Sequence, residues 1–228
     1  MSDDEENEGI PCKVVLLGES GVGKTSILTK FVTGIFPKLV MVSTTSSYVS
    51  KNIKVDENYI VKLKLWDTAG QERYRSLAKI FYQNAAAAIL VYDIRSLHSF
   101  NEIKNYWANE IKSNSPKDII IAICANKSDE YLEQEVPTQE GKNLAKELNA
   151  IFMCTSAKEG TGIEDLFNLI ATKFIEPSKD ISESFMNKEE IIEQRKKKFL
   201  EEKIKNKKIK VETEKNKKNK KKGCCSNG

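Results

Sequence analysis

GESGVGKT, residues Gly18 to Thr25, is the segment from which the architecture of the chain can be inferred. It follows the apolar run Lys13–Leu17 and precedes an amphipathic segment, so it joins a predicted strand to a predicted helix. Its glycines can take the positive φ angles that let successive backbone N–H groups curl around an anion, at which the following helix also points its positive end. We therefore predict a phosphate-binding loop, in which Lys24 reaches the β- and γ-phosphates and the Thr25 hydroxyl binds Mg²⁺. The residues expected to contact nucleotide here are Gly18, Glu19, Ser20, Gly21, Val22, Gly23, Lys24, Thr25 and Ser26.

Short apolar runs alternate with amphipathic segments on both sides of this loop. Near-continuous apolar runs such as 86–92 are typical of strands with both faces buried, and the alternation predicts a three-layer α/β fold. We expect a six-stranded, mostly parallel sheet with one antiparallel strand, paired across a turn at 55–59, and about five helices. The domain should end near Ile175, because Pro177 cannot easily continue the last helix. The expected strands are 13–17, 47–55, 59–66, 86–92, 119–124 and 151–154, and the expected helices are 24–33, 75–83, 99–113, 138–148 and 162–174.

A second motif, Asp67-Thr68-Ala69-Gly70-Gln71, places a carboxylate at the end of a predicted strand and a glycine turn after it. Asp67 suits a hold on Mg²⁺ through water, Gly70 can offer its N–H to the γ-phosphate, and Gln71 can orient an attacking water. An aspartate at a strand end often only begins a turn. Together with the glycine loop, however, it indicates a site for a nucleoside triphosphate.

Two polar segments follow later strands, at the sheet edge where α/β folds bind ligands. The first is Asn126-Lys127-Ser128-Asp129, in which the carboxylate of Asp129 can accept two hydrogen bonds from the N1–H and 2-amino groups of guanine. Adenine lacks both donors and would leave that carboxylate unpaired, so such a site discriminates strongly. The second is Thr155-Ser156-Ala157-Lys158, where the backbone N–H of Ala157 can meet the guanine O6. The first segment alone would be an ordinary polar turn, but in this order the two predict a guanine site.

With these motifs in this order, the chain from about Cys12 to Ile175 resembles the Ras superfamily of small GTPases, and within it the Rab family. WDTAGQERY, residues 66–74, is similar to the Rab form of the second switch. VYDI, residues 91–94, and the C-terminal CCSNG look most similar to the early-endosome branch of Rabs. The resemblance implies a P-loop GTPase domain with bound Mg²⁺ and GTP or GDP. It further implies that Gln71 and Lys24 serve catalysis and that the GTP form recruits effectors through switch segments near 37–47 and 68–80.

The resemblance also implies roles that the motifs alone do not give. Phe36 would pack against the guanine ring, and the stems of Lys127 and Lys158 would cover its faces. Together with Asn126, Asp129, Ser156 and Ala157, these residues form the expected base-binding set.

A first-switch threonine would bind Mg²⁺ when the γ-phosphate is present, beside Thr25 and Asp67. Counting back from Trp66 selects Thr44, whereas counting forward from Phe36 misses it by one residue. Thr45 therefore stays an alternative to Thr44. With no arginine in the phosphate motifs to offset the developing charge, intrinsic hydrolysis should be slow and assisted by an activating protein.

The C-terminal part of the chain differs in charge from the rest. From Lys188 onward there are 16 Lys or Arg and 7 Asp or Glu, a balance of +9, which leaves −5 for residues 1–187 because the whole chain carries +4. Such a tail favours anionic lipid or nucleic acid. It lacks the interleaved aromatic residues that stack on bases, so we expect no nucleic-acid partner. The pair Cys224–Cys225 is similar to the Rab arrangement that carries a geranylgeranyl group on each thiol, and two such chains give lasting membrane attachment.

The chain is expected to divide into four parts: a disordered acidic N-terminus over 1–10, a GTPase domain over 11–176, a variable basic tail over 177–222 and a prenylation segment over 223–228. No run approaches the roughly 20 apolar residues of a membrane-spanning helix. Cys12, Cys124 and Cys154 border apolar runs and should behave as small buried hydrophobes.

As a Rab-like switch, the chain would regulate vesicular and endosomal membrane traffic. Its implied partners are a guanine nucleotide exchange factor, a GTPase-activating protein, effectors, and prenylation escort and dissociation-inhibitor proteins. Its expected place is the cytoplasmic face of an intracellular membrane, the early endosome by resemblance, with a soluble cytosolic pool. A P-loop ATPase or nucleotide kinase would share the glycine loop but lack the two base-reading segments. A scaffold that binds nucleotide without hydrolysis would not need Gln71 and Thr25.

Overall fold

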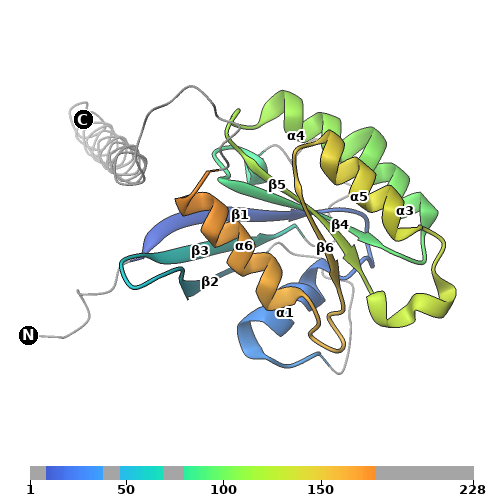
Figure 1. Ribbon diagram of the computed structural model, residues 1–228, viewed down its shortest axis with the longest axis horizontal. Coiled ribbons are helices and arrows are strands. Elements are labelled where there is room, and N and C mark those ends of the chain that lie inside the picture. The colour runs from blue at the N-terminus through green and yellow to red at the C-terminus, as the bar shows by residue number, and fades with distance from the viewer. Residues whose placement is uncertain (1–8, 38–46, 69–79, 178–228) are drawn as a thin grey trace, which may run out of the picture. The chain divides into compact units, whose positions relative to one another are not determined.

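The computed structural model of the chain describes residues 9–37, 47–68 and 80–177. Within these ranges six strands form one sheet in the order β2-β3-β1-β4-β5-β6 (Figure 1). β2 pairs antiparallel with β3, and the other neighbouring pairs are parallel. The strands are β1 Ile10–Leu17, β2 Ser47–Lys54, β3 Ile60–Asp67, β4 Ala87–Asp93, β5 Ile120–Asn126 and β6 Ile151–Thr155. This confirms the predicted α/β fold with a mostly parallel sheet and one antiparallel strand.

Helices cover both faces of the sheet (Figure 1). α1 and α6 lie on one face, where the rings of Phe31 and Phe167 stack with their centroids 3.9 Å apart. The other face packs against α3, the π-helical turn η2, α4 and α5, and the core between them includes Tyr92, Trp107 and Leu144. The helices are α1 Lys24–Thr33, α3 Leu97–Glu102, η2 Ile103–Trp107, α4 Ala108–Asn114, α5 Thr138–Glu147 and α6 Ile163–Ile175.

β4 is buried along its whole length because helices cover it on both sides, as its continuous apolar run predicts. Cys12 and Cys124 are buried, and Cys154 is half-buried. Among the described helices, none is both long enough and apolar enough to cross a membrane.

The expected turn at 55–59 joins β2 to β3. The backbone N–H of Val55 donates to the carbonyl of Tyr59 at 2.9 Å, and the Asp56 carboxylate accepts the N–H groups of Asn58 and Tyr59, both at 2.9 Å. An aspartate that bonds its own backbone two and three residues on is a common turn device. The antiparallel pairing therefore follows from local chemistry.

Most elements lie within two residues of their predicted bounds, and three differ in a more informative way. The helix expected over 99–113 begins at Leu97, because the Ser96 side chain caps it by accepting the N–H of Ser99 at 3.2 Å. It also contains the π-helical turn η2 and ends at Asn114. A 3₁₀ helix, η3 Ser128–Glu133, was not expected. β1 begins at Ile10, inside the segment expected to be disordered.

The carboxyl ends of the parallel strands meet at one edge of the sheet. Asp67 lies opposite Leu16, and Asn126 lies between Asp93 on one side and Thr155 on the other. Each predicted motif therefore begins at this edge, although the motifs are far apart in the sequence.

Candidate nucleotide-binding site

The loop between β1 and α1 takes a conformation that depends on its glycines. Gly18, Gly21 and Gly23 have φ angles of 141°, 76° and 99°. A Cβ atom on Gly18 would overlap the carbonyl oxygen of Val91, and one on Gly23 would overlap the side-chain nitrogen of Asn126. Positive φ and the missing Cβ are therefore both required at Gly18 and Gly23.

Lys24 begins α1 and is 4% exposed. Its ammonium group donates to the carbonyl oxygens of Gly18 at 2.7 Å and Glu19 at 2.8 Å. A buried cation needs such partners to offset its lost hydration. These two bonds close the loop, so the ammonium group is fixed beside the N-terminus of α1. Ser26, in the first turn of the same helix, is also buried.

Thr25 connects the loop to the end of β3. Its hydroxyl donates to Oδ2 of Asp67 at 2.6 Å, and Asp67 is 1% exposed. The other carboxylate oxygen of Asp67, Oδ1, is buried and has no hydrogen-bond partner among the described residues. Burial raises the pKa of Asp67 above its usual value, against the Thr25 hydrogen bond and the Lys24 charge, which lower it. The neighbouring Thr68 hydroxyl is held by the Leu16 carbonyl at 2.5 Å.

Asn126, at the end of β5, joins three segments. Its side-chain N–H donates to the carbonyl of Val22 in the glycine loop at 2.8 Å, and its side-chain oxygen accepts the Thr155 hydroxyl at 3.1 Å. Asn126 is 1% exposed. It therefore fixes the glycine loop relative to the segments that follow β5 and β6.

Asp129 and the segment after β6 are in direct contact. Oδ1 of Asp129 accepts the Ser156 hydroxyl at 2.7 Å, and Oδ2 lies 3.6 Å from the ammonium of Lys158. The Ser156 hydroxyl also accepts the N–H of Glu159 at 3.0 Å, which makes a tight turn around the buried Ala157. The two predicted base-reading segments are therefore brought together.

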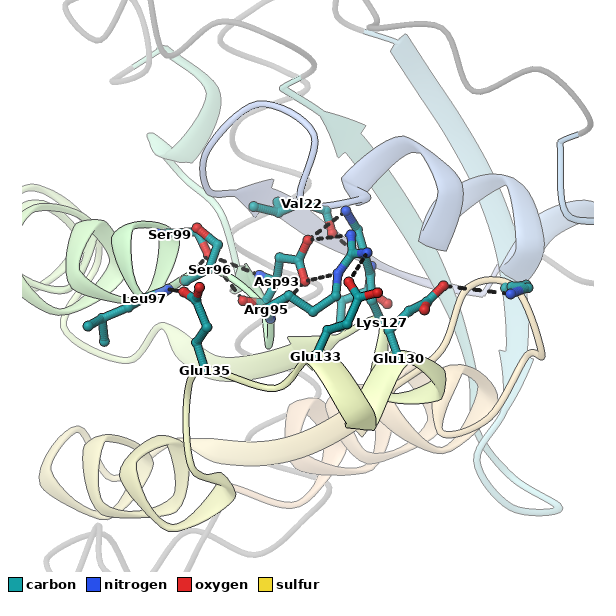
Figure 2. Close-up of polar contacts among 12 residues, drawn as sticks. Val22, Asp93, Arg95, Ser96, Leu97, Ser99, Lys127, Glu130, Glu133 and Glu135 are labelled. Carbon is teal, nitrogen blue, oxygen red and sulfur yellow. Dashed lines mark hydrogen bonds and ion pairs between the residues drawn. The ribbon is translucent and has the colours of Figure 1, made fainter.

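Asp93, at the end of β4, holds two cations (Figure 2). Oδ2 of Asp93 lies 2.7 Å from the ammonium of Lys127 and 3.0 Å from Nη2 of Arg95. Oδ1 accepts the side-chain Nε–H of Arg95 at 3.2 Å and its backbone N–H at 3.0 Å. Burial by itself raises the pKa of Asp93, but the hydrogen bonds from Arg95 and Lys127 outweigh burial and hold this pKa below its usual value.

The structure thus gathers the phosphate-loop residues, Asp67 and the base-reading segments at one edge. Phe36 is half-buried shortly after α1. Several predicted site residues lie outside the described ranges, and so do most of the two switch segments and of the helix expected over 75–83, of which 80–82 are helical. These site residues are Thr44 with its alternative Thr45, Gly70, Gln71, Cys224 and Cys225.

Sequence reasoning did not assign a role to Asp93 or Arg95. Their position offered one indication: Asp93 ends a buried strand at the same edge as Asp67 and Asn126. That Lys127 would be its partner depends on the pairing of β4 with β5, which the local sequence does not reveal.

Comparison with known proteins shows the family to which the chain belongs. A sequence profile described as the Ras family matches residues 13–176, which include the glycine loop and both base-reading segments. The chain is 42% identical over 163 residues to Ras-related protein RabJ of Dictyostelium discoideum, covering 72% of this chain and 63% of that protein. It is 40% identical over 168 residues to Ras-related protein Rab-22A of Homo sapiens, covering 74% of this chain and 84% of that one. It is also 40% identical over 164 residues to Ras-related protein Rab5A of Oryza sativa subsp. japonica, covering 72% and 80%.

Proposed function

The chain belongs to the Ras family, in its Rab branch of small GTPases, and from this we propose that it is a membrane-traffic switch that binds GTP and hydrolyses it slowly to GDP. The observation that carries this proposal is the junction at Asn126. This side chain bonds both Val22 of the glycine loop and Thr155, the first residue of the second base-reading segment. A single ligand with phosphates at one end and a base at the other would fit such a junction.

On the phosphate side, the backbone N–H groups of residues 18–26 surround the β-phosphate, as expected of a positive-φ glycine loop ahead of a helix. Lys24, now held by the carbonyls of Gly18 and Glu19, extends toward the β- and γ-phosphates. Gly70 supplies a further N–H to the γ-phosphate. These donors balance the negative charge that develops during transfer of the terminal phosphoryl group.

The residues around Thr25 and Asp67 fit a magnesium ion. Oδ1 of Asp67 is a buried carboxylate oxygen without a hydrogen-bond partner in the described ranges. The Thr25 hydroxyl donates to the other oxygen, Oδ2. Hard oxygen donors of this kind suit Mg²⁺, which keeps several waters and takes its remaining ligands from substrate phosphates. No three His, Cys, Asp or Glu side chains gather as a metal site within residues 9–37, 47–68 and 80–177. Waters and phosphate oxygens would supply the remaining ligands of the ion. Thr44, or Thr45 in its place, adds a ligand in the GTP form. When bound, the ion neutralises charge on the β- and γ-phosphates.

On the base side, Asp129 accepts the N1–H and 2-amino groups of guanine, and the N–H of Ala157 donates to O6. Ser156 and Lys158 hold Asp129 in place from the neighbouring segment. Asn126 fixes this pocket to the phosphate loop, while Phe36 and the stems of Lys127 and Lys158 contact the ring. A carboxylate in this position rejects adenine, because adenine lacks the N1–H and 2-amino donors that guanine presents to it.

In the cycle, the γ-phosphate holds the segments near 37–47 and 68–80 in the form that recruits effectors, and hydrolysis releases them. Gln71 aligns the attacking water. Turnover without help is slow, on the order of 10⁻⁴–10⁻² s⁻¹ as in related switches, because a GTPase-activating protein must supply the missing positive charge. An exchange factor then replaces GDP with GTP.

On the membrane side, geranylgeranyl groups on Cys224 and Cys225 and the lysines of the tail attach the protein to the cytoplasmic face of an intracellular membrane. The early endosome is the compartment that the resemblance favours. Escort and dissociation-inhibitor proteins deliver and extract the lipidated form and so maintain a cytosolic pool. Mass spectrometry of the C-terminal peptide from native protein should find two isoprenoid additions; free thiols in the membrane fraction would contradict this.

Two measurements test the central proposal. The nucleotide released by denaturing the purified protein should be GDP or GTP, and calorimetry with Mg²⁺ should give much tighter binding of GDP than of ADP. Equal affinity for the two would defeat the assignment of the base site. Single-turnover hydrolysis of preloaded GTP should be slow and slower still in Gln71→Leu. A fast hydrolysis rate that is unchanged in Gln71→Leu would overturn the hydrolytic mechanism.

A further inference from the structure

Asp93 has a place in the molecule that the proposed nucleotide contacts do not explain. It ends β4 between the glycine loop and the 3₁₀ helix η3, and its side chain is 11% exposed. Each of its oxygens already has partners: Oδ1 accepts two N–H groups of Arg95, and Oδ2 lies within 3.0 Å of both Arg95 and Lys127. The carboxylate therefore acts on protein groups.

The segment that carries Asp129 is tied at both of its ends to this carboxylate (Figure 2). At the start, Lys127 has a left-handed backbone with φ 65°, which is costly for a residue other than glycine, and its ammonium lies 2.7 Å from Asp93. At the end, Glu133 lies 3.4 Å from Nη1 of Arg95, the residue whose other nitrogens bond Asp93. Asp129 lies in the sequence between Lys127 and Glu133, the residues that form these two ion pairs.

We propose that Asp93 is a positioning residue for the base pocket: it holds Lys127 directly and Glu133 through Arg95, and thereby slows the release of guanine nucleotide. This inference rests on the proposed function, since it concerns the same pocket. It goes beyond that function by assigning part of the nucleotide's residence time to a carboxylate that the nucleotide does not touch.

The physical reason is the sharing of one anion by two cations. Arg95 and Lys127 meet at the same oxygen of Asp93, and without its negative charge they would repel each other. Lys127 would then lose the partner that keeps its stem in place. Its left-handed backbone would still be unfavourable in conformational free energy. Asparagine in place of Asp93 preserves the shape of the side chain, removes its charge and turns one acceptor oxygen into an amide donor.

The test is the rate at which a fluorescent derivative of GDP leaves the full-length protein, chased by excess GDP in Mg²⁺. Asp93→Asn should speed release about tenfold, the effect of losing one charged hydrogen bond. Arg95→Gln should speed it less, because Lys127 keeps its ion pair. Lys127→Met should speed it at least as much as Asp93→Asn.

The double variant Asp93→Asn with Lys127→Met distinguishes positioning from general destabilisation. If Asp93 acts through Lys127, the double variant releases the nucleotide no more than about twofold faster than Lys127→Met alone. Multiplication of the two single effects would overturn the proposal. Ile111→Val, a buried change in α4, provides the comparison for lost stability, and its effect should multiply with that of Lys127→Met.

A matched ion pair provides the second control. Lys51 and Glu164 lie 3.0 Å apart on β2 and α6, away from the pocket, so Glu164→Gln should leave the release rate unchanged. Equal acceleration by Glu164→Gln and Asp93→Asn would contradict the inference. Failure of the parent protein to bind the GDP derivative would instead refute the proposed function, so the two failures can be told apart.

Discussion

The phosphate loop, residues 18–25, is held by its own backbone, whereas the base-binding segment, residues 126–133, is held by side chains from other strands. In the loop, three glycines have positive φ and Lys24 closes the turn onto the carbonyls of Gly18 and Glu19. In the base-binding segment, the left-handed residue is Lys127, and its support comes from Asp93 at the end of β4.

This difference separates two ways of building a binding site. A backbone cradle needs particular residues at fixed spacing, and its partners are peptide groups that every residue supplies. A side-chain network needs partners that only the pairing of strands brings together. Asn126 belongs to both, since it bonds Val22 in the loop and Thr155 at the end of β6.

The largest expected effect is on base recognition alone. Asp129→Asn places an N–H donor opposite the 2-amino group of guanine, so the affinity for GDP should fall on the order of a thousandfold. Xanthosine diphosphate carries an oxygen at that position and should gain affinity. Calorimetry with both nucleotides measures the exchange of preference. An equal loss of affinity for both nucleotides would mean that the substitution disturbs the whole site and does not change base recognition alone.

A somewhat smaller effect is expected from Gly23→Ala in the phosphate loop. Its Cβ would overlap the Asn126 side chain in a backbone with φ 99°, so unfolding should become easier by about 3 kcal/mol. Gly34→Ala is the matched control: φ is 73° there as well, but nothing lies within 4 Å of the added atom. Its cost should be about 1 kcal/mol. Urea unfolding measures both, and equal costs would contradict the argument that Asn126 confines the loop.

Asp67→Asn tests the orphaned oxygen at the end of β3. Because the pKa of Asp67 is raised in the folded chain, its contribution to stability is complete below pH 3.8 and is lost as the pH rises through the raised value. In chelator without nucleotide, the parent should therefore lose stability over this window and Asp67→Asn should not.

With Mg²⁺ and GDP, the variant should lack about 2 kcal/mol of the stabilisation that Mg²⁺ adds to the parent. Denaturant unfolding with and without Mg²⁺ compares the two, and an equal Mg²⁺ response would exclude Asp67 from the ion's shell.

The smallest effect concerns the charge of Asp93. Its pKa is lowered in the folded chain, so its contribution is present above pH 3.8 and is lost as the pH falls through the lowered value. The groups around it are Arg95 and Lys127, with Glu130 and Glu133 near Arg95. Asp93→Asn should therefore show a shallower loss of stability in acid than the parent, measured by unfolding between pH 5 and about pH 2. An unchanged slope would mean that this network does not stabilise the charged form.

The sequence alone predicted the sheet, its antiparallel edge and the segments of the site, because each leaves a local trace. Buried strands are continuous apolar runs, as in β4, and the glycine loop has a fixed spacing between a strand and a helix. The start of α3 was misplaced because the capping role of Ser96 was not recognised. The helix η3 was missed because polar residues such as Asp129 and Glu130 are equally common in turns.

What the sequence by itself determined is which residues can form the pocket: the glycine loop, the carboxylate proposed to read guanine and the aspartate proposed to hold Mg²⁺ each lie within a few consecutive residues. Only the tertiary structure decided how those parts are held. The register of β4 against β5 places Asp93 beside Lys127, and the register of β5 against β6 places Asn126 beside Thr155. Such contacts join residues that are distant in the chain, so no local pattern records them, and the energy of each depends on burial that only the packed sheet provides.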